Sequence, residues 1–277
     1  MNRKIHITFI TPCFCRGADC SPSGFPEIRP PSIRGQLHWW FRALGGSYAD
    51  ENVIFGNVHG EAKASKLVVR VLSPLTPRTE QSPTLPHKSG GPAAPKQAVA
   101  VGESFDLLLS TRLGGLTSEL EAMFSKALEA WLHMGALGLR ATRGGGNFNW
   151  EEQPDTPEEY EAAVARIIQG SSLQATLLNK DYQNAEAARR DITNTLADRA
   201  FGSAAPLGKA FNGRKTSPLR FRVVSFSSGG FRILAVWDGR NAVTRNTGRD
   251  LENAIKTLAA ANKPIGLQLR QAWTEMR

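Results

Sequence analysis

Residues 27–44, with the sequence EIRPPSIRGQLHWWFRAL, have the pattern of a helix whose sides differ in chemistry. Ser32 can cap this helix, and Gly45-Gly46 end it after about Leu44. At helical spacing its apolar side chains fall on one stripe, which comprises Ile33, Leu37, Trp40, Phe41 and Leu44. We therefore predict that the helix packs one face on a sheet.

A second stripe of the same predicted helix is cationic. Arg34, His38 and Arg42 recur at intervals of four residues, Trp39 lies on the far flank, and Arg29 precedes the helix. Cations and the free N–H groups of a helix start are groups that bind phosphates. A basic stripe is also typical of a solvated helix face, and the residues alone leave both interpretations open.

On either side of this helix the chain alternates between strand and helix patterns. β-Branched segments predict strands at residues 4–10, 66–72 and 104–111, and residues 118–134 predict a helix capped by Ser118. The order strand, helix, strand, strand, helix favours an α+β fold whose first half is a split βαβ, ferredoxin-like unit.

Composition predicts where the chain divides. Residues 73–102 contain six prolines, and we expect a long mobile insertion without core elements there. Residues 151–161 are acidic, contain two further prolines and predict a linker. The expected domains are therefore residues 1–150 and a basic, helix-rich, ferredoxin-like unit of residues 151–277.

The second predicted domain contains a hairpin signal. Residues 219–226 and 231–237 flank a Ser-Ser-Gly-Gly sequence, which predicts two paired strands. Alternation puts Arg220 and Arg222 on one face, either to follow phosphates or only to meet solvent. Helices are expected near residues 158–169, 185–197 and 249–261.

The formal net charge is +9, and the excess is confined to one end of the sequence. Residues 1–198 hold 20 Lys and Arg against 21 Asp and Glu, whereas residues 199–277 hold 14 against 4. A localised basic field is typical of proteins that bind a polyanion, of which nucleic acid is the commonest. Solubility charge alone is the alternative interpretation.

Residues 135–148 form a segment rich in glycine. Its five glycines would let backbone N–H groups approach a phosphodiester, and Arg140 and Arg143 add positive charge. It is not a Walker A loop, because no Gly-Lys-Ser/Thr follows, and it does not open a helix with G-x-G-x-x-G. A turn that only connects two elements is the alternative.

Residues 28–44 are similar to the motif IRP-S-IRG-LRWWWRA of the first-subunit family of type III-B (Cmr) CRISPR effector complexes, within the RAMP superfamily. Further elements follow in the family order: Thr11-Pro12, Gly17-Ala18-Asp19, Phe55-Gly56, the glycine-rich residues 135–148, and RKTSPL at residues 214–219. The chain departs from the family pattern at His38, where the family has Arg, and at Gly146-Asn147-Phe148.

This resemblance implies tandem ferredoxin-like (RAMP/RRM-like) domains, of which the second can be degenerate. It implies a non-catalytic RNA-binding subunit at the 3′ end of the guide RNA, which helps to admit target RNA in antiviral defence. The expected partners are guide RNA, target RNA and neighbouring RAMP subunits, with no cofactor or metal. Together with the residue patterns it predicts these RNA contacts: Arg29, Arg34, His38, Trp39, Arg42, Arg140, Arg143, Gly144, Gly145 and Phe148.

Other functions stay open at the level of sequence. His38 could serve as the general base of a guide-processing RAMP endoribonuclease, or the chain could be a purely architectural capping subunit. Asp19 matches the type of residue that a neighbouring RAMP subunit uses in metal-dependent cleavage, but an Asp in such a loop more often caps a turn. The chain has no Gly-Gly-Asp-Asp sequence, which excludes polymerase-like nucleotide cyclisation.

The cysteine content and the hydropathy of the chain limit the remaining classes of protein. Cys13, Cys15 and Cys20 lack the paired knuckles of structural zinc, which favours free thiols over a metal site. Few cysteines, odd in number, indicate a reducing cytoplasm. No apolar run reaches the length of about eighteen residues that a membrane span requires, so no span is expected.

Overall fold

The computed structural model describes residues 1–17, 24–58, 62–72, 77–88, 94–112, 114–194, 219–227 and 229–238. The expected helix at residues 249–261, Asp19, Cys20 and most of the RKTSPL motif lie outside them. Most of the basic C-terminal region also lies outside, so its contact with a polyanion stays a prediction. Within the described ranges, no helix combines the length and the apolar character that a membrane crossing needs.

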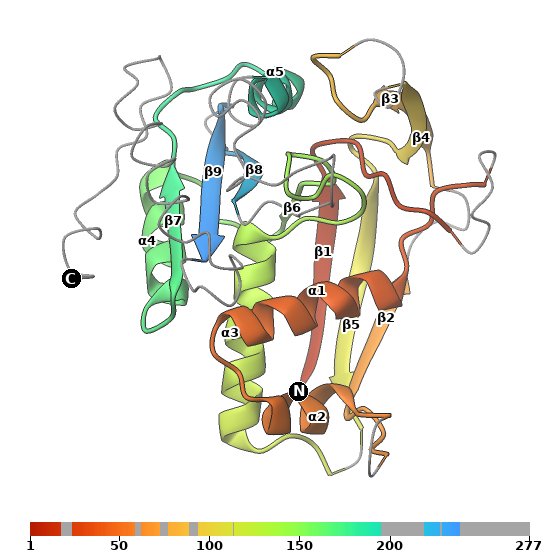
Figure 1. Ribbon diagram of the computed structural model, residues 1–277, viewed down its shortest axis with the longest axis vertical. Coiled ribbons are helices and arrows are strands. Elements are labelled where there is room, and N and C mark those ends of the chain that lie inside the picture. The colour runs from red at the N-terminus through yellow and green to blue at the C-terminus, as the bar shows by residue number, and fades with distance from the viewer. Residues whose placement is uncertain are drawn as a thin grey trace, which may run out of the picture.

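Four antiparallel strands form the central sheet in the order β2-β5-β1-β6. They are β1 (Asn2–Phe9), β2 (Leu67–Leu72), β5 (Ser104–Thr111) and β6 (Phe148–Trp150). Helix α1 (Pro30–Ala43) comes between β1 and β2, and helix α3 (Ser118–Met134) between β5 and β6 (Figure 1). This is the split βαβ, ferredoxin-like arrangement, so the predicted α+β fold is confirmed.

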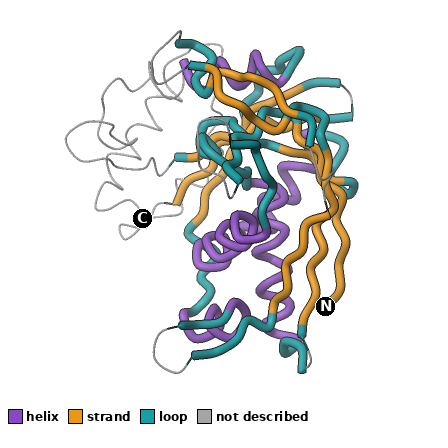
Figure 2. Tube along the Cα trace, turned by 90° about the vertical axis from the view of Figure 1, so that its right-hand side faces the viewer, coloured by secondary structure: helices purple, strands orange, loops and turns teal. Residues whose placement is uncertain are grey.

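Both helices lie on one face of the central sheet, and the opposite face is open (Figure 2). The alternation along β1 follows from this, because Ile5, Ile7 and Phe9 are buried whereas Lys4 and His6 are exposed. Each large apolar side chain buried in this way stabilises the fold by roughly 2 kcal/mol.

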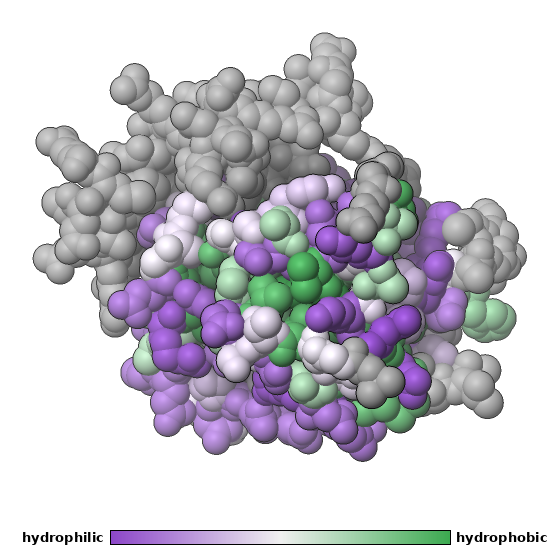
Figure 3. Space-filling view, turned by 90° about the horizontal axis from the view of Figure 1, so that it is seen from below, coloured by the Kyte–Doolittle hydropathy of each residue, from purple (hydrophilic) through white to green (hydrophobic). Residues whose placement is uncertain are grey.

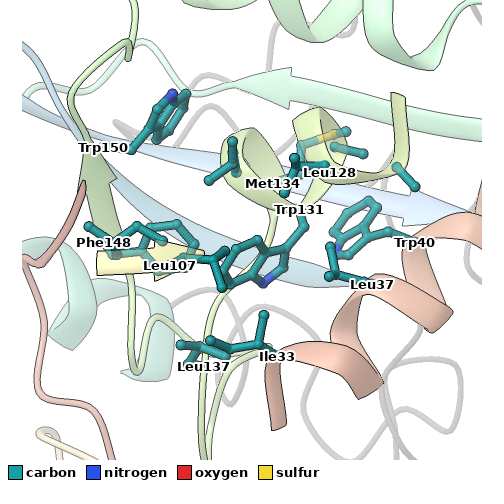
Figure 4. Close-up of a cluster of buried hydrophobic side chains, with 14 of the residues drawn as sticks. Ile33, Leu37, Trp40, Leu107, Leu128, Trp131, Met134, Leu137, Phe148 and Trp150 are labelled. Atoms are coloured by element: carbon teal, nitrogen blue, oxygen red, sulfur yellow. The ribbon is translucent and has the colours of Figure 1, made fainter. Parts of the chain in front are cut away.

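The apolar stripe predicted for α1 forms the core of this unit. Ile33, Leu37 and Trp40 are fully buried, and they share one cluster with Trp131 of α3 (Figure 4). The same cluster extends to Val224 of the second sheet, so this core joins the two sheets. A second cluster, which includes Phe221 and Trp237, lies on the other face of the second sheet.

The N-cap of α1 lies three residues before the predicted one, and that of α3 one residue before it. α1 begins at Pro30, with Arg29 rather than Ser32 at the N-cap and no capping side chain. Proline suits this position, because the first helical N–H has no partner in any case. α3 is capped by Thr117 rather than Ser118, because the Thr117 hydroxyl accepts a backbone hydrogen bond of 3.3 Å.

The prediction of a structureless insertion at residues 73–102 is wrong for its described parts. Strands β3 (Thr79–Pro83) and β4 (Pro95–Val99) pair there as an antiparallel ribbon. Val99 is fully buried, and its backbone exchanges two hydrogen bonds with Cys13. Two of the prolines face each other at the end of the ribbon, where a missing N–H is tolerated.

A short helix that the sequence did not predict, α2 (Tyr48–Phe55), follows α1. Ser47 caps it by accepting a hydrogen bond from the Asp50 N–H at 3.1 Å. α2 and the start of α3 lie at the lower end of the molecule in Figure 1, and hydrophilic side chains surround a small apolar patch on that face (Figure 3).

A second antiparallel sheet has the strand order β7-β9-β8. It comprises β7 (Leu173–Leu177), β8 (Arg220–Ser225) and β9 (Phe231–Asp238), accompanied by α4 (Pro157–Ile168) and α5 (Ala185–Asp191). The predicted hairpin is therefore confirmed, as are the two helices; α5 continues into a π-helical turn at residues 192–194, and the end of its predicted range, residues 195–197, lies outside the described residues. Whether residues 151–277 form a degenerate ferredoxin-like domain stays a prediction.

Candidate nucleic-acid interface

Arg34, the first member of the basic stripe, binds the end of α2. Its guanidinium donates one hydrogen bond to the Phe55 carbonyl and another, of 3.1 Å, to the Ser65 hydroxyl. Burial lowers the pKa of Arg34 from its ordinary value, with a smaller contribution from Arg112. Arg34 therefore satisfies a carbonyl at the C-terminus of α2, where a cation is also favoured by the helix dipole.

His38 and Arg42 share one buried carboxylate. Glu51 of α2 is 2% exposed, and its two oxygens lie 2.6 Å from His38 Nδ1 and 2.7 Å from Arg42 Nε. The His38 ring stacks on Phe55 with 3.9 Å between centroids. Burial lowers the pKa of His38, and the hydrogen bond to Glu51 opposes that shift. The basic stripe is thus not merely solvated, because it docks α2 against α1.

The side of α1 next to the basic stripe faces solvent, and Arg42 lies at the border between the two. Ser32, Gly35 and Arg42 are exposed and Trp39 is half-buried, and these positions lie on one helical stripe. A Cβ at Gly35 would meet no atom within 4 Å, so packing does not require glycine there. Glycine inside a helix costs about 1 kcal/mol relative to alanine. The bare backbone therefore leaves room for close approach of a partner.

Trp39 connects this stripe to the second sheet. The Arg220 guanidinium of β8 lies 3.7 Å from the centre of a Trp39 ring, and Trp39 meets Trp40 edge to face at 4.7 Å. Burial lowers the pKa of Arg220 to about 10. This partner of Arg220 could not be predicted from sequence, because the contact joins segments far apart in the chain.

The glycine-rich segment uses its N–H groups inside the protein. Gly144 donates to the Phe221 carbonyl, Gly145 to the Arg140 carbonyl and Gly146 to the Pro12 carbonyl. The structure therefore does not contain the predicted cradle, in which Gly144 and Gly145 would offer their N–H groups to a phosphate. A Cβ at Gly146 would lie 1.9 Å from the Leu137 carbonyl oxygen, so close packing explains the glycine.

The glycine-rich segment also places Arg143 beside β8. Arg143 forms a parallel bridge with Phe221, and the Phe221 N–H donates to the Thr142 carbonyl at 3.1 Å. Arg140 has a left-handed backbone with φ of 64°, and both arginines are half-buried. Because Arg220 precedes Phe221, the structure brings Trp39 of α1 and Arg143 to the same end of β8.

Two predicted contact residues have other roles. Phe148 is fully buried and packs 5.0 Å from the Trp131 ring, so it has no exposed face for a base and is removed from the candidate site. Arg29 donates to the Gly17 carbonyl at 3.3 Å and holds the preceding loop against the start of α1.

The expectation that Arg222 lies on an exposed strand face is wrong. Arg222 is 1% exposed and donates to the Gly135 carbonyl at 2.7 Å and to the Phe148 carbonyl. Its guanidinium also lies 4.8 Å from the Phe148 ring centre. The alternation of the hairpin was predicted correctly, but this face points into the core, because β8 packs against the first unit.

The open face of the central sheet is a second candidate surface. At its centre Asp106 binds Lys4 Nζ at 2.9 Å and His6 Nδ1 at 2.8 Å, and the hydrogen bond from His6 is the first cause of its lowered pKa. The outward positions of the four strands carry no Phe, Tyr or Trp. Sheets that bind single-stranded RNA stack bases on aromatic rings, so this face lacks such a platform.

The described residues do not assemble a metal centre. No group of three or more His, Cys, Asp or Glu side chains in these ranges could hold an ion. Cys13 and Cys15 are buried free thiols with their sulfurs 2.9 Å apart. Burial is the first cause of the raised pKa of Cys13, which disfavours the thiolate that metal binding requires.

The split βαβ fold of the first unit is accompanied by a family match. A model of the RAMP superfamily matches residues 6–149, which is more than half of the chain, and the chain therefore belongs to that superfamily. Two curated relatives are the CRISPR system Cmr subunits Cmr1-1 and Cmr1-2 of Pyrococcus furiosus. The chain is 39% identical to Cmr1-1 over 59 residues, 18% of each protein. It is 38% identical to Cmr1-2 over 63 residues, 20% of the chain and 32% of the relative. These matches span less than a third of either relative.

Solved structures extend the likeness of fold. The crystal structure of apo Cmr1 from Pyrococcus furiosus matches with a TM-score of 0.58 and 16% identity, over 86% of this chain and 88% of that one. A chain of the type III-B Cmr-beta complex bound to cognate target RNA and AMPPnP matches with a TM-score of 0.56 and 11% identity, over 90% and 98%. At these identities the matches establish a shared fold.

Proposed function

We propose that this chain is a non-catalytic RNA-binding subunit of a type III-B CRISPR effector complex. It would lie at the 3′ end of the guide RNA in the cytoplasm, beside other RAMP subunits, and help to admit target RNA in antiviral defence. Support comes from RAMP membership and from the likeness to Cmr subunits, one of them in a complex that contains target RNA.

The observation that carries the proposal is the solvent-facing stripe of α1. Gly35 leaves the helix backbone bare, Trp39 offers an aromatic surface, and the Arg42 side chain is 62% exposed. α1 contains no acidic residue. An aromatic group, cations and an uncrowded backbone are the combination that binds single-stranded RNA.

The structure refines which predicted residues we propose for direct contact. Trp39 and Arg42 lie on the stripe, and Arg140 and Arg143 lie at the neighbouring loop. Arg29, Arg34 and His38 would act indirectly, because their hydrogen bonds position α1, its preceding loop and α2. Gly144 and Gly145 would shape the loop through their internal hydrogen bonds.

A matched pair of arginines tests this proposal. Arg42 and Arg166 each lie in the last turn of a helix, each binds a glutamate, and their side chains are 62% and 65% exposed. We expect Arg42→Gln to weaken binding of labelled single-stranded RNA about fivefold and to reduce its salt dependence. Arg166→Gln should change neither quantity. Equal effects of the two substitutions, or no binding by the unmodified chain, would refute the proposal.

Co-expression tests membership of the complex. The chain is expected to co-purify with other type III-B subunits and a uniform population of small RNAs. Cleavage of repeat RNA by the isolated chain, lost in His38→Ala, would instead identify the guide-processing endonuclease. Co-purification with subunits but no crosslink to RNA would identify an architectural capping subunit.

A further inference from the structure

Arg220 of β8 differs in its surroundings from two other inward-facing arginines, Arg189 and Arg222. Arg189 donates to the Ser82 hydroxyl and the Pro83 carbonyl, and Arg222 donates to two carbonyls. Arg220, by contrast, makes no hydrogen bond or ion pair within the described part of the chain. Its partner there is the face of Trp39, at 3.7 Å.

Such a guanidinium is unfavourable in the protein alone. A buried cation loses hydration, and an aromatic face replaces only part of it, because the five N–H donors lie in the plane of the group. Burial is the cause of the lowered pKa of Arg220. The residue is nevertheless half-buried rather than fully enclosed, which is the access that an anion from solution requires.

We propose that Arg220 is a phosphate-binding residue of this chain and that an RNA phosphodiester is its missing partner. Stacking on Trp39 fixes the plane of the guanidinium, which favours bidentate contact with two phosphate oxygens. This inference rests on the proposed function and adds a contact on the second sheet to the α1 stripe. An RNA strand would therefore bridge α1 and β8.

The neighbouring charges support a polyanion rather than a protein carboxylate. Arg143 lies beside the same end of β8 through its bridge to Phe221, and Trp39 lies one helical turn from exposed Arg42. α1 contributes no acid, and Glu51 of the neighbouring α2 is already bound by His38 and Arg42. A repeating backbone of phosphates matches several cations at once.

The test replaces Arg220 with methionine, which keeps the side-chain stem on Trp39 and removes the charge. In the full chain, Arg220→Met is expected to weaken binding of labelled polyuridine RNA about tenfold and to reduce the slope of log affinity against log salt by about 0.7. Its melting temperature without RNA should equal or exceed that of the unmodified protein, because an unpaired buried charge is lost.

Arg232→Met is the matched control. Arg232 lies on neighbouring β9 and binds Asp181 at 2.7 Å, so this substitution removes the same charge from a paired position and should leave RNA affinity unchanged. Two results would overturn the inference and leave the proposed function standing. One is an RNA affinity that is unchanged in Arg220→Met. The other is displacement of RNA by inorganic phosphate added at the same concentration as the phosphate groups of the RNA. No RNA binding by the unmodified chain would overturn both.

Discussion

Arg220 and Arg222 lie two residues apart on β8 and point to the same face of the strand, but they meet opposite surroundings. Arg222 is in the interior, where two carbonyl groups accept its hydrogen bonds and two aromatic rings enclose it. Arg220 is at the junction with α1, where its guanidinium lies over the Trp39 ring and makes no hydrogen bond or ion pair within the described chain. The residue type and the alternation are identical, so the available acceptors decide whether an arginine packs the fold or is free to bind a ligand.

The contrast between groups bound within the protein and groups that face solvent also separates the glycines and cations of two regions. In the interior region around Arg222 the protein itself accepts most of the available hydrogen bonds, as the internal N–H bonds of Gly144 and Gly146 and the two bonds from Arg222 to carbonyls illustrate. At the solvent-facing stripe of α1, Gly35 has no packing neighbour within 4 Å and Arg42 is largely exposed. Interior substitutions should therefore change stability, and substitutions on the stripe should change binding.

The largest effect is expected for Arg222→Met. This change leaves the carbonyls of Gly135 and Phe148 buried without a donor, and each unsatisfied carbonyl costs roughly 2 kcal/mol. We expect the free energy of unfolding in urea to fall by about 4 kcal/mol. Arg220→Met is the matched control and should not destabilise the protein. Similar losses in both variants would show that the two surroundings are equivalent.

A somewhat smaller loss is expected for Gly146→Ala. The added Cβ would lie 1.9 Å from the Leu137 carbonyl oxygen, at a residue whose φ of 61° already disfavours side chains. Relief requires the loop to move, and we expect the free energy of unfolding to fall by about 3 kcal/mol. Chemical denaturation measures this, and a loss below about 1 kcal/mol would show that the loop is not fixed by this contact.

The pH dependence of stability probes the same interior region. Burial is the main cause that lowers the pKa of His133 to about 4, and the charges of Arg222 and Arg166 add to it. The unfolded chain therefore binds more protons than the folded chain between about pH 4 and pH 6.5. The stabilising contribution of neutral His133 is therefore present above pH 6.5, and stability should fall by about 2 kcal/mol between pH 7 and pH 5 as this contribution is lost.

The control for this prediction is His133→Gln, whose amide does not titrate. Its free energy of unfolding should depend less steeply on pH over the same interval, because the contribution of His133 is removed. Identical pH profiles for the two proteins would mean that His133 titrates normally in the folded state. Urea unfolding at several pH values provides the measurement.

Much of the first unit could be predicted from local pattern. The alternation of β1 and the apolar stripe of α1 each depend on residues close in sequence, and both predictions are confirmed. The ribbon of β3 and β4 could not be predicted, because proline-rich composition usually indicates a loop. Its order comes from distant contacts such as the Val99 hydrogen bonds to Cys13.

The site was predicted less completely than the fold. The cations of α1 were identified, but their partners Glu51 and Phe55 lie on α2, a helix whose pattern is too short to recognise. The contact of Arg220 with Trp39 joins residues far apart in sequence, and charged residues on strands are ordinarily expected to face solvent. Which face of a hairpin is buried depends on the element that packs against it.

The smallest expected change in stability has the opposite sign. Gly35→Ala adds a methyl group where no atom lies within 4 Å, and alanine favours the helix by about 1 kcal/mol over glycine. The free energy of unfolding should therefore rise by about that amount, in contrast to Gly146→Ala. If RNA approaches the bare backbone of α1, the same methyl group should weaken RNA binding severalfold although the fold is more stable. A variant that gains stability and binds RNA as tightly as the unmodified protein would show that the strand does not pass over Gly35.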